Sequence, residues 1–158
     1  MELLLIILVL IIVILTFLLL KKERVFGINT EDNSEKDKVK IIESKGLQDR
    51  VKLVTDFLDD DAAISTLAKC ELLVFPYQNT KESASGAVRM GVASGVPIAV
   101  SPIPIFDDVN GAIRMRGGTV EDIVASISML SQEDLDTSKQ AIVELRDSLQ
   151  WDEVAKRI

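Results

Sequence analysis

An unbroken apolar run near the start of the chain constrains its architecture more than any other feature of the sequence. The run covers residues 3–20, and Thr16 is its one mildly polar member. As a helix it would be roughly 27 Å long, which is close to the hydrocarbon thickness of a bilayer. The sequence therefore predicts a transmembrane helix over residues 1–20 that anchors the chain in a membrane.

A cleaved signal peptide is the alternative interpretation of this run. Such a peptide has a basic segment before its apolar core and a small-residue cleavage site after it. Here no basic side chain precedes the core, and Lys21, Lys22 and Arg24 follow it directly. Because these charges lie on the C-terminal side, the positive-inside rule places the rest of the chain in the cytoplasm. We therefore expect a single-pass membrane protein with a cytoplasmic C-terminal domain.

The composition of the whole chain narrows the classes of function. Its 158 residues carry a formal net charge of -7, which disfavours a nucleic-acid partner because such a partner favours a basic face. The chain has no histidine, which excludes a Ser-His-Asp triad and a histidine-ligated zinc. The single cysteine, Cys70, has no internal disulfide partner and suits a reducing compartment. We expect neither a metal site nor a nucleic-acid partner.

Residues 21–36 differ in composition from the segments on both sides. They are polar and rich in turn-forming residues, among them Gly27, Asn29 and Asn33, as is typical of a linker. Regular apolar periodicity begins after them. The predicted organisation is thus an anchor over residues 1–20, a linker over 21–36 and one domain over 37–158.

Short apolar runs alternate with helical patterns through the predicted domain. Strands are expected at residues 51–54, 72–75 and 97–100. Helical periodicity begins near Lys36, Asp59, Ser85, Thr119 and Ser131. Such alternation is typical of a parallel sheet with helices on its faces, so the expected fold class is α/β and Rossmann-like. Three convincing strands are fewer than such a domain usually has.

The segment after the second predicted strand carries the candidate chemistry. It is a loop followed by a helix that starts with Ser83, Ala84, Ser85 and Gly86. Small residues let a ligand approach the backbone, and the free N–H groups and dipole of a helix start favour a phosphate. Ligands of open α/β sheets also lie beyond the carboxyl ends of strands. Spacing alone leaves open an ordinary loop with a Ser-capped helix.

Six segments of the predicted domain match the pattern of a known family in order and spacing. They are GLQDRVKL (46–53), FLDD (57–60), LLVFPY (72–77), ESASGA (82–87), ASGVPIAV (93–100) and PIFDDV (104–109). In these segments the chain resembles the C-terminal domain of retaining GT-B glycosyltransferases, the broad family that includes sucrose and glycogen synthases. The resemblance covers roughly three quarters of the chain. It implies half of a GT-B fold, here preceded by a transmembrane helix.

The resemblance also implies roles for the residues of the loop and helix start. In that family a Glu-x7-Glu pattern begins at the position of Glu82, and this first glutamate lies near the donor sugar. The resemblance therefore implies that Glu82 is the catalytic residue and that the backbone of residues 83–86 holds the donor phosphates. The implied donor substrate is a nucleotide-diphosphate sugar, with no separate cofactor.

The sequence departs from the family pattern in three places. Met90 stands where the second glutamate, which usually contacts the nucleotide ribose, is expected. The strand, glycine-bearing loop and basic residue that normally open the family's domain have no counterpart in the pattern. The N-terminal acceptor domain is missing as well, and glycosyl transfer needs donor and acceptor in one closed cleft. We expect the chain to be inactive alone and to need a separate N-terminal domain.

Two other interpretations of these departures remain open. In one, the chain is a non-catalytic, membrane-tethered interaction or regulatory module. In the other, it is the remnant of a broken glycosyltransferase gene.

The charged residues near the motif have structural interpretations at this stage. Arg89 is turned about 100° away from Met90 on the predicted helix and is not assigned to the site. Residues 107–108 fit a solvated turn, although the resemblance places that loop near the donor pocket. Arg114 and Arg116 flank a predicted edge strand and are expected to face solvent.

Overall fold

The computed structural model describes residues 25–26, 35–54, 57–78, 84–150, 152 and 155. The predicted anchor over residues 1–20 lies outside these residues. Among the helices of the described part, none has the length and apolar character needed to cross a membrane.

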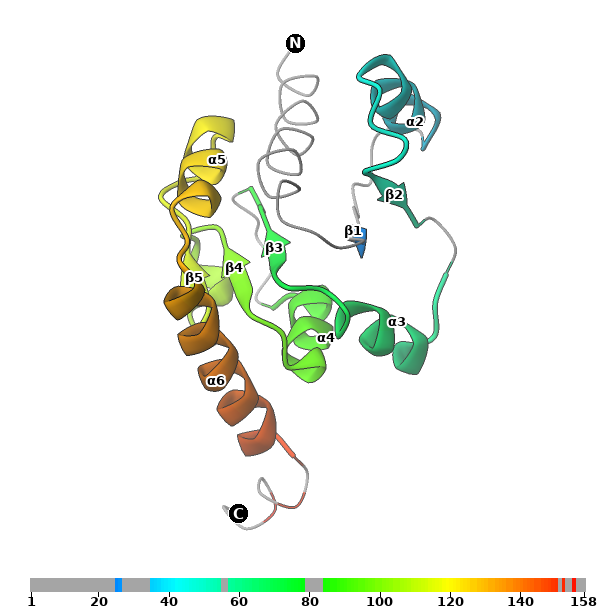
Figure 1. The fold of residues 1–158 in the computed structure, drawn as a ribbon. Coiled ribbons are helices and arrows are strands. Elements are labelled where there is room, and N and C mark those ends of the chain that lie inside the picture. Colours follow the sequence, from blue (N-terminus) through cyan, green and yellow to red (C-terminus); the bar gives the residue numbers. More distant parts are fainter. Residues whose placement is uncertain are drawn as a thin grey trace.

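The described chain alternates strands and helices, as the sequence predicts (Figure 1). Its elements are β1 (Val25–Phe26), α2 (Glu35–Ser44), β2 (Lys52–Leu53), α3 (Asp60–Leu67), β3 (Leu73–Phe75), α4 (Gly86–Ser94), β4 (Ile98–Val100), the 3-10 helix η1 (Pro104–Phe106), β5 (Ile113–Arg114), α5 (Val120–Ser128) and α6 (Gln132–Ser148). The predicted strands at 51–54, 72–75 and 97–100 correspond to β2, β3 and β4. The α/β fold class is confirmed.

The strand pairings of the described chain are parallel. Strands β3, β4 and β5 form one sheet in that order, with Leu73 opposite Ile98 and Ala99 opposite Ile113. Strands β1 and β2 form a second, two-stranded sheet. Parallel neighbours require a crossover, and α4 supplies the one between β3 and β4. The carboxyl ends of β3, β4 and β5 consequently meet at one edge, which we call the carboxyl edge.

Strand β1 corrects one expectation from the sequence. Val25 and Phe26 lie in the segment predicted as a linker, yet they pair with Lys52 and Leu53. The sequence therefore missed a strand before the first helix, and β1, α2 and β2 form a parallel unit. Two apolar residues are too few for periodicity to indicate a strand. The edge strand expected near Arg114 is confirmed as β5.

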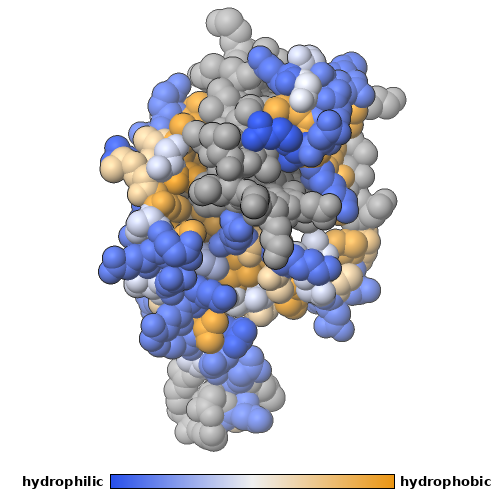
Figure 2. Space-filling model, viewed as in Figure 1, coloured by the Kyte–Doolittle hydropathy of each residue, from blue (hydrophilic) through white to orange (hydrophobic). Residues whose placement is uncertain are grey.

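The sheet β3–β4–β5 separates two hydrophobic cores. One core contains the fully buried Ile98 and Val100 with Ile142 of α6, and it also includes residues of α4. The other contains Ala99 and Ile127, where α5 covers the opposite face. Strand β4 is thus buried on both faces, as is typical of a central parallel strand. The outer surface of α6 is by contrast mostly hydrophilic (Figure 2).

Four helices begin at the capping residues that the sequence indicates. The caps are Asp59 for α3, Ser85 for α4, Thr119 for α5 and Ser131 for α6. Ser131 and Asp134 form a complete capping box. The Ser131 hydroxyl and backbone N–H both donate to the Asp134 carboxylate, and they hold its pKa below the ordinary value of 3.8. At Thr119 the hydroxyl accepts from the Asp122 N–H at 3.2 Å and donates to the Asp122 carboxylate at 2.6 Å.

We expect Gly111→Ala to lower the free energy of unfolding by about 2–4 kcal/mol. Gly111 has a φ of +87°, and a Cβ there would overlap the Ala141 methyl group of α6. The Ser138 hydroxyl of α6 donates to the Gly111 carbonyl at 2.8 Å. This bond holds the turn against α6, so the turn cannot move away without breaking it. Urea unfolding of the full chain in mild detergent, followed by circular dichroism, measures the loss.

Gly118→Ala is the matched control for this substitution. Gly118 has no positive φ, and none of the described atoms lies within 4 Å of the position of its Cβ. The change in unfolding free energy should stay within about 0.5 kcal/mol. Equal losses at the two glycines would contradict the assignment of the Gly111 turn.

Candidate functional site

The carboxyl edge brings the start of α4 next to the segments that follow β3 and β4. Ser101 follows β4 directly and is fully buried. Its backbone N–H donates to the Phe75 carbonyl at 3.2 Å, and its hydroxyl donates to the same oxygen at 3.4 Å. These bonds continue the pairing of β3 and β4 past the strand ends. The loops at this edge therefore start from fixed positions.

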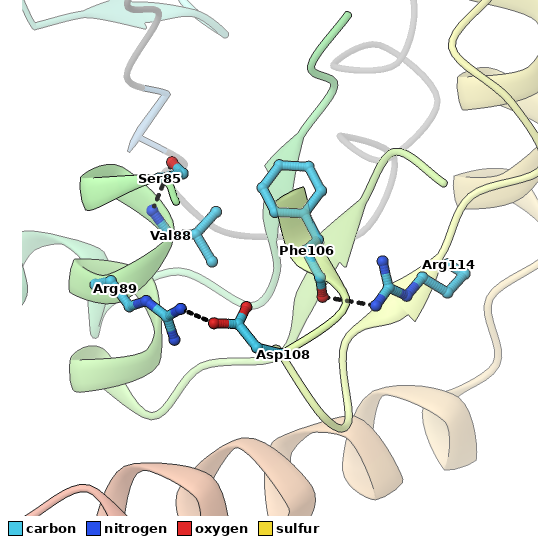
Figure 3. Close-up of polar contacts among 6 residues, drawn as sticks. All are labelled: Ser85, Val88, Arg89, Phe106, Asp108 and Arg114. Atoms are coloured by element: carbon cyan, nitrogen blue, oxygen red, sulfur yellow. Dashed lines mark hydrogen bonds and ion pairs between the residues drawn. The ribbon is translucent and has the colours of Figure 1, made fainter. Parts of the chain in front are cut away.

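Ser85 connects the start of α4 to the segment after β3. Its side chain is buried, and its Oγ accepts from the Val88 N–H at 3.4 Å (Figure 3). The same hydroxyl donates to the Tyr77 hydroxyl at 3.1 Å. The Tyr77 ring in turn packs edge-on against Phe75 and Phe106, with centroid distances of 6.3 and 5.3 Å. The Ser85 side chain is thus engaged within the protein, and it fixes the first turn of α4.

The first two residues of α4, Gly86 and Ala87, are exposed. First-turn N–H groups have no intrahelical acceptor, and Ser85 takes only that of Val88. The N–H groups of Gly86 and Ala87 meet no acceptor within the described residues, and both residues are exposed. Apart from its chain neighbours and the backbone of its own helix, no described residue has an atom within 4 Å of where a Cβ of Gly86 would be. Within the described residues, no side chain at position 86 obstructs an anion at this helix start.

The structure places three of the five predicted site residues. Ala84, Ser85 and Gly86 lie together at the start of α4, with Ala84 and Gly86 exposed. Glu82 and Ser83 lie outside the described residues, so their roles stay predictions. Met90, at the position of the missing second glutamate, is half-buried in α4.

Two arginines contact the turn at residues 104–108, which we call the η1 turn (Figure 3). Arg89 of α4 forms an ion pair with Asp108. Arg114 of β5 donates to the Phe106 carbonyl at 2.6 Å and lies 3.8 Å from the Asp107 carboxylate. The Arg89–Asp108 pair could not be predicted from the sequence, because its partners are 19 positions apart and no local pattern relates them.

The described residues contain no group of three or more histidine, cysteine, aspartate or glutamate side chains that could hold a metal ion. The carboxyl edge presents the Gly86 and Ala87 N–H groups at the start of α4, and Arg89 follows about one helical turn later. Such an arrangement suits a phosphate group.

Comparison with known proteins supports the fold. The sequence matches no family profile and no curated protein. Among solved structures, the chain is similar to the crystal structure of Anabaena Alr3699/HepE in complex with UDP and glucose, with a TM-score of 0.57 and 16% identity. The match covers 93% of this chain and 44% of the Anabaena chain. This chain therefore spans less than half the length of the Anabaena protein. The likeness confirms a shared Rossmann-like α/β architecture.

We expect Ser85→Ala and Tyr77→Phe to lower stability in a non-additive way. Each alone should reduce the free energy of unfolding by about 1 kcal/mol, because each removes the hydrogen bond between the two hydroxyl groups. Ser85→Ala also removes a helix cap. The double variant should lose about 0.5–1 kcal/mol less than the sum, since both changes break one bond. Urea unfolding of the four proteins gives this coupling energy.

Ser131→Ala provides the control for that cycle. It removes the equivalent cap of α6, which has no contact with Tyr77 among the described hydrogen bonds. Its loss should therefore add to that of Tyr77→Phe. Full additivity for Ser85 as well would show that the Ser85–Tyr77 bond contributes nothing to the helix start.

Proposed function

We propose that this chain is the nucleotide-sugar-binding half of a GT-B glycosyltransferase. The observation that carries the proposal is the exposed, glycine-bearing start of α4 at the carboxyl edge of a parallel sheet. Ligands of open α/β sheets lie at such edges. The proposal is supported by the structural likeness to a protein crystallised with UDP and glucose. It is supported independently by the six sequence segments that resemble the GT-B family.

In the proposed complex the donor diphosphate lies against the first turn of α4. The N–H groups of Gly86 and Ala87 donate to phosphate oxygens, and the positive end of the helix dipole stabilises the negative charge. Gly86 has no side chain to hold the phosphate away. The bond between Ser85 and Tyr77 keeps these donors in place before the ligand arrives, which lowers the entropic cost of binding. Glu82 is assigned to the donor sugar by the family resemblance.

Glycosyl transfer would require a second domain. The chain spans 44% of the structurally similar protein chain. Stabilising the charge that develops during transfer needs groups on both sides of a closed cleft. We therefore propose that a separate N-terminal domain supplies the acceptor side and that the chain alone binds the donor without transferring the sugar. Because Met90 offers no carboxylate to the ribose, the diphosphate would contribute most of the affinity.

We also propose that the N-terminal segment anchors the chain in a membrane with the α/β domain in the cytoplasm. The 18-residue apolar run and the basic residues after it motivate this proposal. The full chain should remain in the membrane pellet after alkaline carbonate extraction and should dissolve only in detergent. Release into the carbonate supernatant would contradict an integral anchor.

Calorimetric titration of the full chain in detergent with UDP-, GDP- and ADP-sugars tests the proposed binding site. We expect one class of donor to bind with a dissociation constant in the micromolar range. This corresponds to a binding free energy of about -8 kcal/mol. Gly86→Pro should weaken this binding about tenfold, because it removes one N–H donor to a charged group. Proline is accommodated at the first position of a helix, and Ser85 before it has the extended conformation that proline requires, with φ -112° and ψ 117°.

Gln132→Pro is the matched control, because Gln132 holds the equivalent first position of α6 after an extended Ser131. This variant should fold and bind the donor like the wild type. No heat with any donor, from a chain shown to be folded, would contradict the proposed function. That outcome would favour a non-catalytic interaction module.

A further inference from the structure

The ion pair between Arg89 and Asp108 lies within reach of the proposed diphosphate site. Arg89 is the one lysine or arginine of α4 and follows Gly86 by three residues, so the two positions are neighbours on the helix surface. The Cα–Cβ bonds of a helix tilt toward its N-terminus, which directs the Arg89 side chain toward the first turn. Gly86 has no side chain to block the path. Rotation about the side-chain torsions of Arg89 is the movement that would turn the guanidinium toward an anion bound there.

Asp108 holds the guanidinium away from that position. Figure 3 shows Arg89 extending from α4 to Asp108 of the η1 turn. The two side chains are 38% and 58% exposed, so water reaches both partners. Exposed ion pairs contribute little to stability, so breaking this pair costs the protein little. A diphosphate offers more charge than one carboxylate, and the fork of arginine donors matches phosphate oxygens.

The η1 turn keeps its place without this ion pair. Phe106, two residues before Asp108, is fully buried and packs against the Tyr77 ring. On the other side Arg114 donates to the Phe106 carbonyl. Asp108 is therefore positioned by the buried part of its turn, and Arg89 can leave it while the fold stays intact.

We propose that Arg89 exchanges Asp108 for the diphosphate of the ligand, so that Asp108 sets the affinity of the site by competing with the ligand. This inference rests on the proposed function and adds a regulatory pair to its anion site. The chain carries a net charge of -7, which repels an anionic ligand. A guanidinium next to the helix start would offset part of this repulsion. The ligand class is a nucleoside diphosphate or its sugar ester.

Titration of the full chain in detergent with UDP tests the exchange. Asp108→Asn should raise the affinity about two- to fivefold, because it removes the competitor of the phosphate. Arg89→Met should lower the affinity about tenfold. In the Arg89→Met background, Asp108→Asn should have no effect, since its action depends on the guanidinium. If the ion pair only shaped the pocket, Asp108→Asn would lower the affinity instead, which would overturn the inference.

Asp107→Asn is the matched control for charge. It removes the same charge one residue earlier, where the carboxylate lies 3.8 Å from Arg114. Its affinity for UDP should equal that of the wild type. A rise as large as that of Asp108→Asn would indicate a long-range effect of net charge and would overturn the exchange. Titration with inorganic pyrophosphate should reproduce the rise with Asp108→Asn, which assigns the effect to the diphosphate.

The wild type and Asp108→Asn together separate this inference from the proposed function. If the wild type binds UDP and Asp108→Asn binds it no more tightly, the proposed function stands and the exchange is wrong. If only Asp108→Asn binds, the exchange stands and the wild-type chain is not a donor-binding domain as proposed. If neither folded protein binds UDP or pyrophosphate, both are wrong.

Discussion

The close packing of α4 on the sheet determines where the candidate site lies. Gly91 is the contact point, since a Cβ there would come within 3.2 to 3.3 Å of side-chain atoms of Phe75, Ile98 and Leu73. Its φ is not positive, so glycine is needed here for space and not for backbone conformation. Val88 and Val92 extend the contact along the helix and are almost fully buried. Because α4 follows β3 in the chain, a helix held this closely on the sheet begins near the carboxyl edge.

The two kinds of contact around the start of α4 differ in how firmly they hold. The bond from Ser85 to Tyr77 and the packing of Tyr77 on Phe106 are formed by buried or half-buried groups. The pair of Arg89 with Asp108 is exposed to water on both sides. Buried contacts therefore fix the backbone donors, while the proposed exchange involves only the exposed pair. A rigid set of donors with one exchangeable charge is a suitable design for a site that binds and releases an anion.

Local patterns were sufficient to predict much of this fold. The caps at Ser85 and Ser131 and the strand at 73–75 depend on residues close in sequence, so the sequence alone indicates them. Strand β1 could not be predicted in this way, because it becomes a strand only by pairing with β2 more than twenty residues later. The same reason hid the Arg89–Asp108 pair. The helix start was recognised from its small residues, but the engagement of the Ser85 hydroxyl by Tyr77 is a tertiary contact with no sequence signal.

Binding and transfer make different demands on such a site. The described carboxyl edge offers two backbone N–H groups at the start of α4, and Arg89, paired with Asp108, lies three residues along the same helix. These groups can stabilise a leaving diphosphate, whose charge grows as the bond to the sugar breaks. Positioning an acceptor on the opposite side of the sugar requires groups that face this edge from elsewhere. Under the proposed function, the chain therefore supplies the half of the reaction that concerns the leaving group, and its activity depends on whatever closes the cleft.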